Sequence, residues 1–368
     1  MPTRRRAGSA SVLLVGKGEP DRGGIRTFLD TLLDSDLARS RTLAFLNLAH
    51  AGIPEGGRAS LGNLRRTMHD AVRVRRAAHG VAIVHLHSAM APAVTAVRGG
   101  VLALAARSRG SRVIVHVHGG LVQVWLTSRV RRALLRSALT PAHQVVAVSS
   151  GGERALRAVV PPARLRLLDN GIDAAAFAPL EQVHEPPRIL FVGLLTPRKG
   201  VLDLLTAARL LRERDIPHEL LLLGGTPDEG PAAEAEVREA LTPEVRLLGS
   251  WPYERMPAAY HEADVFCLPS WWEASPLSVL EAMASSLPVV ATDVGDVARI
   301  VRHGETGLVV PARSPAALAD ALEQLLCQPE RRRAMGAAGR ARVLEHFSRQ
   351  RLEHELDALY DQLEGRTT

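Results

Sequence analysis

The chain has 368 residues, with 46 Lys and Arg against 39 Asp and Glu, and 46% of its residues are hydrophobic. This mixed composition excludes intrinsic disorder, and the length predicts two domains. The chain has only two cysteines, which excludes a disulfide scaffold and favours a reducing compartment. Charge is uneven, because residues 1–180 hold 26 basic and 10 acidic residues, whereas residues 181–368 hold 20 and 29. The excess of basic residues in the first half indicates that this half binds an anionic ligand or surface rather than nucleic acid.

Short apolar runs alternate with longer amphipathic stretches along the whole chain. In the first half, strands are predicted at Val12–Val15, Arg41–Leu46, Val81–Leu86, Arg112–Val117 and Gln144–Val148, and helices at Gly24–Leu33 and Leu61–Ala78. In the second half, strands are predicted at Arg188–Val192, Glu219–Leu223, Val245–Leu247, Val265–Leu268, Val289–Ala291 and Gly307–Val310. Continuous apolar runs between helices are typical of parallel sheets that are covered on both faces. The fold class is therefore α/β, with two Rossmann-like, doubly wound domains.

A proline-rich polar stretch at 176–187 predicts the linker between the domains. We therefore expect a first domain at 1–178 and a second at 179–345, followed by a terminal segment at 346–368. That segment carries leucines at helical spacing, which predicts a terminal helix. No stretch of about 18 apolar residues occurs, so we expect no transmembrane helix and a cytoplasmic protein.

The turn after the first predicted strand is rich in glycine and ends in Gly23-Gly24. Glycines after a buried strand let backbone amides approach a phosphate, and the next helix N-terminus adds a positive dipole. The turn is neither a Walker A loop nor the dinucleotide fingerprint, whose third glycine position is occupied by Asp21. An ordinary glycine-rich turn is the alternative.

Two adjacent cations, Arg198 and Lys199, lie in the turn after the first strand of the second domain. Ligands of open α/β folds bind at the carboxyl ends of strands, and these cations can neutralise a diphosphate there. A solvated pair of charges is the alternative.

The most informative segment runs from Pro269 to Met283. Ser275-Pro276 predicts an N-cap followed by the first residue of a helix. Glu273 then lies in the loop before that helix and Glu281 inside it, so two carboxylates flank a helix N-terminus that can hold an anion. Carboxylates can accept hydrogen bonds from a polyhydroxylated ligand. The alternative for Glu273 is a favourable interaction of its negative charge with the dipole of the helix.

A set of motifs spaced along nearly the whole chain resembles the retaining glycosyltransferases of family 4, which have the GT-B fold. The motifs are Gly23-Gly24, Val115–Gly119, Val148–Ser150, Asn170–Asp173, Glu273-x7-Glu281, Leu287–Val290, Ala291–Gly295 and His303–Val310. The resemblance implies a hexosyltransferase whose two domains face each other across a cleft. It would move a sugar from a nucleotide-diphosphate sugar to an acceptor hydroxyl with retention, and it would need no further cofactor.

The resemblance also assigns roles to individual residues. Glu281 would bind the ribose of the nucleotide, Glu273 the donor sugar, and Arg198 with Lys199 the diphosphate. The backbone around the following residues would lie near the sugar and the diphosphate: Ala274, Ser275, Pro276 and Leu277. Gly23-Gly24 would close on the diphosphate from the other domain, and His118 would lie near the transferred sugar. The terminal helix at 346–368 would cross back onto the first domain.

One departure from the family pattern concerns Leu194, which occupies a position where the family often has arginine. This departure keeps open the alternative of a catalytically impaired partner subunit. A nucleotide-sugar epimerase, a related enzyme of the same fold, is a second alternative. The implied acceptor is a saccharide or a lipid-linked saccharide of cell-envelope or exopolysaccharide synthesis.

Four histidines lie near the ends of two predicted strands: His85, His87, His116 and His118. His118 is either a functional residue or a buried structural one. We expect His116 to be structural and to point to the opposite face of the strand. We predict no metal site, because His85 and His87 lack acidic or cysteine partners at metal-binding spacing.

Residues 121–140 combine Trp125 with four arginines among leucines and valines. A basic amphipathic helix with an aromatic residue can lie in a membrane interface. We therefore predict peripheral contact with an anionic membrane through 121–140, at the inner face of the membrane. A core-facing helix with arginines on its solvent side is the alternative.

Overall fold

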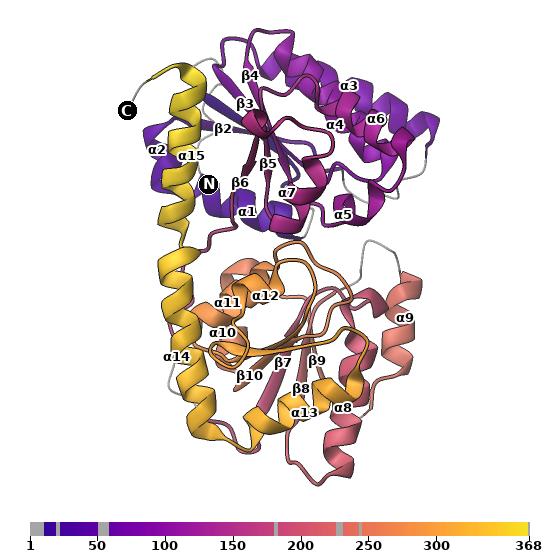
Figure 1. The fold of residues 1–368 in the computed structure, drawn as a ribbon, viewed down its shortest axis with the longest axis vertical. Helices are drawn as coiled ribbons and strands as arrows, with labels where there is room; N and C mark the ends of the chain where they lie inside the picture. The colour runs from indigo at the N-terminus through magenta and orange to yellow at the C-terminus, as the bar shows by residue number, and fades with distance from the viewer. Residues whose placement is uncertain are drawn as a thin grey trace. The chain divides into compact units, whose positions relative to one another are not determined.

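The computed structural model describes residues 11–19, 23–50, 59–179, 183–225, 231–242 and 245–366. The chain forms two compact units, one ending at Gly171 and resuming at Arg349, and one spanning Ile172–Ser348 (Figure 1). The first division thus falls at 171/172, whereas the sequence predicted 178/179. The reason is that Ile172, Ala174 and Phe177 are buried in the core of the second unit.

The first unit contains a sheet of six parallel strands in the order β2-β1-β3-β4-β5-β6. Its strands are β1 Val12–Gly16, β2 Leu43–Asn47, β3 Ile83–Ser88, β4 Arg112–Val117, β5 Gln144–Ala147 and β6 Leu165–Leu167. The strands predicted in this half are confirmed. The three-residue β6 was not predicted, because so short a run shows no period.

Helices cover both faces of this sheet (Figure 1). They are α1 Gly24–Leu33, α2 Asp36–Ser40, α3 Leu61–Ala77, α4 Ala93–Arg107, α5 Leu121–Trp125, α6 Arg129–Leu139, α7 Ser150–Leu156 and α15 Arg349–Glu364. Side chains alternate along a strand, so Leu13 and Val15 of β1 join the core under α3, α4 and α6. Val12 and Leu14 join the opposite core, under α1 and α15.

The terminal helix α15 packs on the first unit through Leu352, Leu356, Leu359 and Tyr360, all of which are buried. Arg41, just before β2, forms ion pairs with three carboxylates of this helix: Asp357, Asp361 and Glu364. The helical spacing of leucines in the sequence therefore corresponds to a real helix, and its buried stripe covers one face of the first sheet.

The second unit contains another sheet of six parallel strands, in the order β12-β11-β10-β7-β8-β9. Its strands are β7 Arg188–Val192, β8 Glu219–Leu223, β9 Val245–Gly249, β10 Val265–Leu268, β11 Val289–Thr292 and β12 Gly307–Val310. Its helices are α8 Val201–Glu213, α9 Pro231–Glu239, α10 Met256–His261, α11 Leu277–Ala284, α12 Val297–Ile300, α13 Pro315–Leu326 and α14 Pro329–His346. The strands predicted here are confirmed, and so is the doubly wound α/β fold class. The chain order reverses between β7 and β10, which is where ligands bind in such sheets.

Residues 121–140 do not form the single helix that the sequence suggested. The chain turns at 126–128, between α5 and α6. Trp125 packs into the core and is only 9% exposed, so it is not a surface anchor. None of the helices in the described ranges combines the length and apolar content that crossing a bilayer requires.

Candidate active site

Two loops meet at the point where the strand order of the second sheet reverses. One follows β7 and contains Arg198 and Lys199 in a short 3-10 turn, Pro197–Lys199. The other follows β10 and contains Trp271, Trp272 and Glu273. The Trp271 amide donates to the Arg198 carbonyl over 2.9 Å, so the two loops are joined directly.

Lys199 and Glu273 form an ion pair at this edge of the sheet. The lysine Nζ lies 2.6 Å from Glu273 Oε1, and the hydroxyl of Ser270 donates to the same oxygen over 2.7 Å. The two charged side chains are 18% and 11% exposed, which makes the pair mostly buried. An ammonium has three donors, so Lys199 can bind an anion while it keeps this contact.

The side chain of Arg198 lies in a different environment from that of Lys199. Its guanidinium lies over the ring of Trp272, 4.7 Å from the ring centre. A planar cation stacked on an aromatic face keeps its N–H groups at its edge. The two predicted diphosphate ligands are therefore adjacent but are held by different partners, an indole and a carboxylate.

Gly295, in the loop after β11, fixes the backbone around Glu273. Its φ of +57° is left-handed, and a Cβ there would lie 2.2 Å from the carbonyl oxygen of Glu273. The amide of Asp296 donates to the Ala274 carbonyl over 3.0 Å. Only glycine allows this close approach, so the resemblance motif that contains Gly295 acquires a physical role that the sequence did not reveal.

Helix α11, which follows the loop that contains Glu273, begins one residue later than predicted. Its N-cap is Pro276, with φ −73° and ψ 118°, and α11 starts at Leu277. Ser275 was therefore wrongly predicted as the N-cap, because Pro276 still has an extended ψ and is not yet helical. The cap makes no side-chain hydrogen bond, so no cap side chain satisfies the first amides of α11.

Glu281 lies inside α11 and is only 5% exposed. The hydroxyl of Tyr260 donates to its Oε2 over 2.6 Å. Burial raises the pKa of Glu281 to about 7, and the hydrogen bond from Tyr260 only partly opposes that rise. Sequence reasoning missed Tyr260, because nothing in the spacing of α10 and α11 indicates this contact.

The first unit holds the remaining predicted residues. Gly23 is the N-cap of α1 and Gly24 its first residue, and this cap makes no side-chain hydrogen bond either. His118 follows β4, where its ring packs against Phe28 of α1, with the ring centres 5.0 Å apart. Burial lowers the pKa of His118 to about 3, so the imidazole is neutral at physiological pH.

The predicted direction of the His116 side chain was wrong. Its ring stacks on that of His118 with 4.4 Å between the centres, so the two side chains point to the same face. Residues two apart on a strand share a face, so His116 and His118 point the same way. Ile114, two residues earlier on β4, belongs to the core under α1 and α15 and marks the same face.

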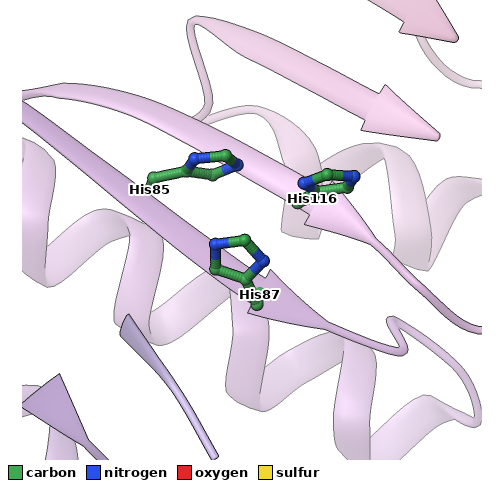
Figure 2. Close-up of side chains that lie close together, drawn as sticks. All are labelled: His85, His87 and His116. Atoms are coloured by element: carbon green, nitrogen blue, oxygen red, sulfur yellow. The ribbon is translucent and has the colours of Figure 1, made fainter. Parts of the chain in front are cut away.

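His85 and His87 of β3 share this face with His116, and Figure 2 shows the three rings close together. Each offers a nitrogen, and these nitrogens lie within 4.8 Å of one another. The prediction of no metal site considered only acidic and cysteine partners for His85 and His87, whereas the third nearby nitrogen comes from a histidine, so it stays a prediction. That histidine is on a neighbouring strand, where spacing along one strand could not reveal it.

Comparison with known families covers most of the chain. Residues 38–176 match the family described as Glycosyltransferase Family 4, and residues 174–342 match the family described as Glycosyl transferases group 1. The two matches meet close to the division between the structural units.

Sequence relatives include a GDP-mannose-dependent alpha-(1-6)-phosphatidylinositol monomannoside mannosyltransferase of Mycobacterium tuberculosis. It is 33% identical over 290 residues, which cover 73% of each chain. An alpha-maltose-1-phosphate synthase of Mycolicibacterium smegmatis is 34% identical over 58% of this chain and 61% of its own length. This match thus spans less than two thirds of that relative.

Solved structures share the fold. A sucrose-phosphate synthase from Thermosynechococcus elongatus superposes with a TM-score of 0.80 at 23% identity, over 97% of this chain and all of that one. HepE of Anabaena, in complex with UDP-glucose, superposes with a TM-score of 0.76 at 16% identity, over 95% and 99% of the two chains. These likenesses support the GT-B fold.

Proposed function

Because the chain belongs to the group 1 glycosyl transferases of family 4, we propose that it moves a hexose from a nucleotide-diphosphate sugar to an acceptor hydroxyl with retention of anomeric configuration. The observation that carries the proposal is the Lys199–Glu273 pair beside the start of α11, at the reversal point of the second sheet. This arrangement places a cation and a carboxylate beside the N-terminus of α11. A sugar diphosphate offers the complementary groups: anionic oxygens and hydroxyls.

The second unit is the proposed donor-binding half. Lys199 and Arg198 neutralise the charge that builds up on the departing diphosphate, and the first amides of α11 add their dipole. Glu273, held by Lys199 and Ser270, accepts hydrogen bonds from sugar hydroxyls, and Glu281 accepts them from the ribose. Leu194 supplies no charge, so in this proposal Arg198 and Lys199 are the cations of the turn that meet the diphosphate.

The reaction needs no protein nucleophile in this proposal. The acceptor hydroxyl attacks the anomeric carbon from the face that the diphosphate leaves, and the leaving phosphate takes the acceptor proton. The protein contributes position and charge stabilisation. His118, neutral because burial lowers its pKa, is suited to a hydrogen bond with a sugar hydroxyl rather than to charge stabilisation.

The first unit is the proposed acceptor-binding half, and its solvent face suits an anionic membrane better than residues 121–140 alone do. Four apolar side chains form one exposed stripe along α3: Leu61, Leu64, Met68 and Val72. Arg65, Arg75 and Arg76 flank the stripe and are exposed. Asp70 is the only acidic residue between 59 and 152, and it is buried against Arg98. Exposed apolar side chains edged by arginine are typical of helices that lie in a membrane interface.

Flotation with vesicles tests this membrane contact. The double variant Leu64→Asp/Met68→Asp should lose binding to vesicles that contain anionic lipid, and added salt should weaken the wild type. Leu344→Asp is the matched control, because Leu344 is 50% exposed on α14 of the second unit. Equal flotation of wild type and double variant would contradict the proposed contact.

Transfer itself is tested by incubating the purified protein with nucleotide sugars and a lipid and saccharide extract. The expected result is a new glycoside whose anomeric proton coupling in NMR matches that of the donor. An inverted product would contradict retention. Release of nucleoside diphosphate with no glycosylated acceptor would instead indicate the epimerase alternative.

A further inference from the structure

A cluster of buried histidines remains outside the proposed reaction. His85 and His87 come from β3 and His116 from β4, and the three are at most 5% exposed (Figure 2). Phe28 of α1 covers His87 and His116, with ring centres 5.4 and 5.0 Å away. We call these three residues the histidine cluster.

Two members of the cluster are hydrogen-bonded through one ring nitrogen only. His85 Nδ1 lies 2.8 Å from the hydroxyl of Tyr360, and His87 Nδ1 lies 3.0 Å from Nε2 of His118. Nε2 of His85, Nε2 of His87 and both nitrogens of His116 are buried and have no hydrogen-bond partner. A buried polar atom without a partner costs about 1–3 kcal/mol, so four such nitrogens in one cluster are unusual.

His85 and His87 show the pattern of metal-bound histidines, and His116 has both nitrogens available. A ligating imidazole uses one nitrogen for the metal and donates the N–H of the other to a nearby acceptor. Tyr360 and His118 already take that second position for His85 and His87, and the free nitrogens are the ones left for an ion.

We propose that the histidine cluster binds one divalent transition-metal ion of the kind that prefers imidazole, with zinc as the best fit. Three nitrogen donors without carboxylates disfavour magnesium and calcium, which take oxygen ligands. The candidate ligand nitrogens lie within 4.8 Å of one another, whereas two nitrogens bound to one zinc ion at about 2.0–2.1 Å are at most about 4.2 Å apart, so binding must draw the three rings closer together. Three protein ligands leave a fourth position for water or an anion.

The bound ion has a consequence for His118. Ligation through Nε2 of His87 leaves the proton on Nδ1, which then donates to Nε2 of His118. His118 must then carry its own proton on Nδ1, so the ion sets which nitrogen of His118 is a donor. Only this consequence rests on the proposed function. The binding itself does not depend on it.

Metal binding is tested on the full-length protein after dialysis against a chelator. Titration with Co2+, a spectroscopic substitute for Zn2+, should give one equivalent of visible absorption bands typical of tetrahedral coordination, and Zn2+ should displace it. His116→Asn should abolish the bands, whereas the control His79→Asn, at an exposed position, should leave them unchanged. No stoichiometric binding by the wild type, or unchanged bands in His116→Asn, would overturn the proposal.

A second variant avoids altering a ligand. Tyr360→Phe removes only the hydroxyl that faces His85 Nδ1, and it should weaken cobalt affinity by about 10–100-fold. Should His116→Asn fail to fold, X-ray absorption of the zinc-loaded wild type decides instead. A first shell with at least three imidazoles supports the site, and a shell of oxygen atoms overturns it. These readouts measure binding alone, so their failure leaves the transferase proposal standing.

Discussion

The buried carboxylate of Glu281 should destabilise the protein at neutral and alkaline pH. Burial raises its pKa from about 4.5 to about 7, so its ionised form is less favourable in the folded than in the unfolded chain. The folded-state pKa lies above the unfolded-state pKa. The contribution of Glu281 to stability is therefore fully present below its unfolded-state pKa and is lost as the pH rises through its folded-state pKa. The relevant window therefore runs from pH about 4.5 to about 7.

The isosteric variant Glu281→Gln removes this titration while it keeps the volume of the side chain and an acceptor for Tyr260. A shift of about 2.5 units corresponds to about 3 kcal/mol at pH 8, and to less than about 1 kcal/mol at pH 5. We therefore expect the free energy of unfolding of the variant to exceed that of the wild type by about 3 kcal/mol at pH 8, with most of the advantage lost at pH 5.

Urea unfolding at the two pH values, followed by tryptophan fluorescence, measures this difference. Trp251, Trp271 and Trp272 lie in the second unit, so the signal reports mainly on the unit that contains Glu281. An advantage of equal size at both pH values would refute the reasoning, because it would arise from packing rather than from ionisation. The same variant should bind nucleotide more weakly, which would identify the buried charge as a functional one.

Three further predictions concern single contacts. Lys199→Met should lower the free energy of unfolding by about 3 kcal/mol, measured in urea, because it leaves Glu273 charged and mostly buried without its partner. An unchanged value would show that the ion pair is not formed. Gly295→Ala should lower the Tm more than the control Gly304→Ala, which also has a positive φ but open space around its Cβ. Equal shifts would exclude the close approach to Glu273. Arg41→Ala should cost about 2 kcal/mol and speed hydrogen exchange in α15, since three carboxylates lose one shared partner. Unchanged exchange would contradict this anchoring.

The fold could be predicted from the sequence because buried parallel strands are continuous apolar runs. Val12–Val15 and Val265–Leu268, for example, are apolar on both faces and lie where the runs indicated. Element ends were less certain: the first turn of α11 depends on the ψ of Pro276, which neighbouring residue types do not determine. Trp125 shows a similar limit, because a basic amphipathic pattern does not reveal that its aromatic residue is buried.

The candidate site was only partly predictable for a related reason. Glu273, Glu281 and Lys199 belong to motifs that follow strands, so their place at one edge of the sheet follows from topology. The hydrogen bond from Tyr260 and the approach of Gly295 arise between elements that are distant in sequence. The histidine cluster is the clearest case, because its members come from neighbouring strands whose register the sequence does not specify.

The most direct test of the central claim is calorimetric titration of the full-length protein with nucleoside diphosphates and their sugars. The account predicts that the wild type binds at least one of them and that Lys199→Met and Glu281→Gln each weaken that binding by about tenfold or more, as the loss of a charge-assisted contact requires. The membrane-face variant Leu64→Asp/Met68→Asp should bind as the wild type does. Undetectable binding by the wild type, or equal affinity in all four proteins, would contradict the donor site at Lys199, Glu273 and Glu281.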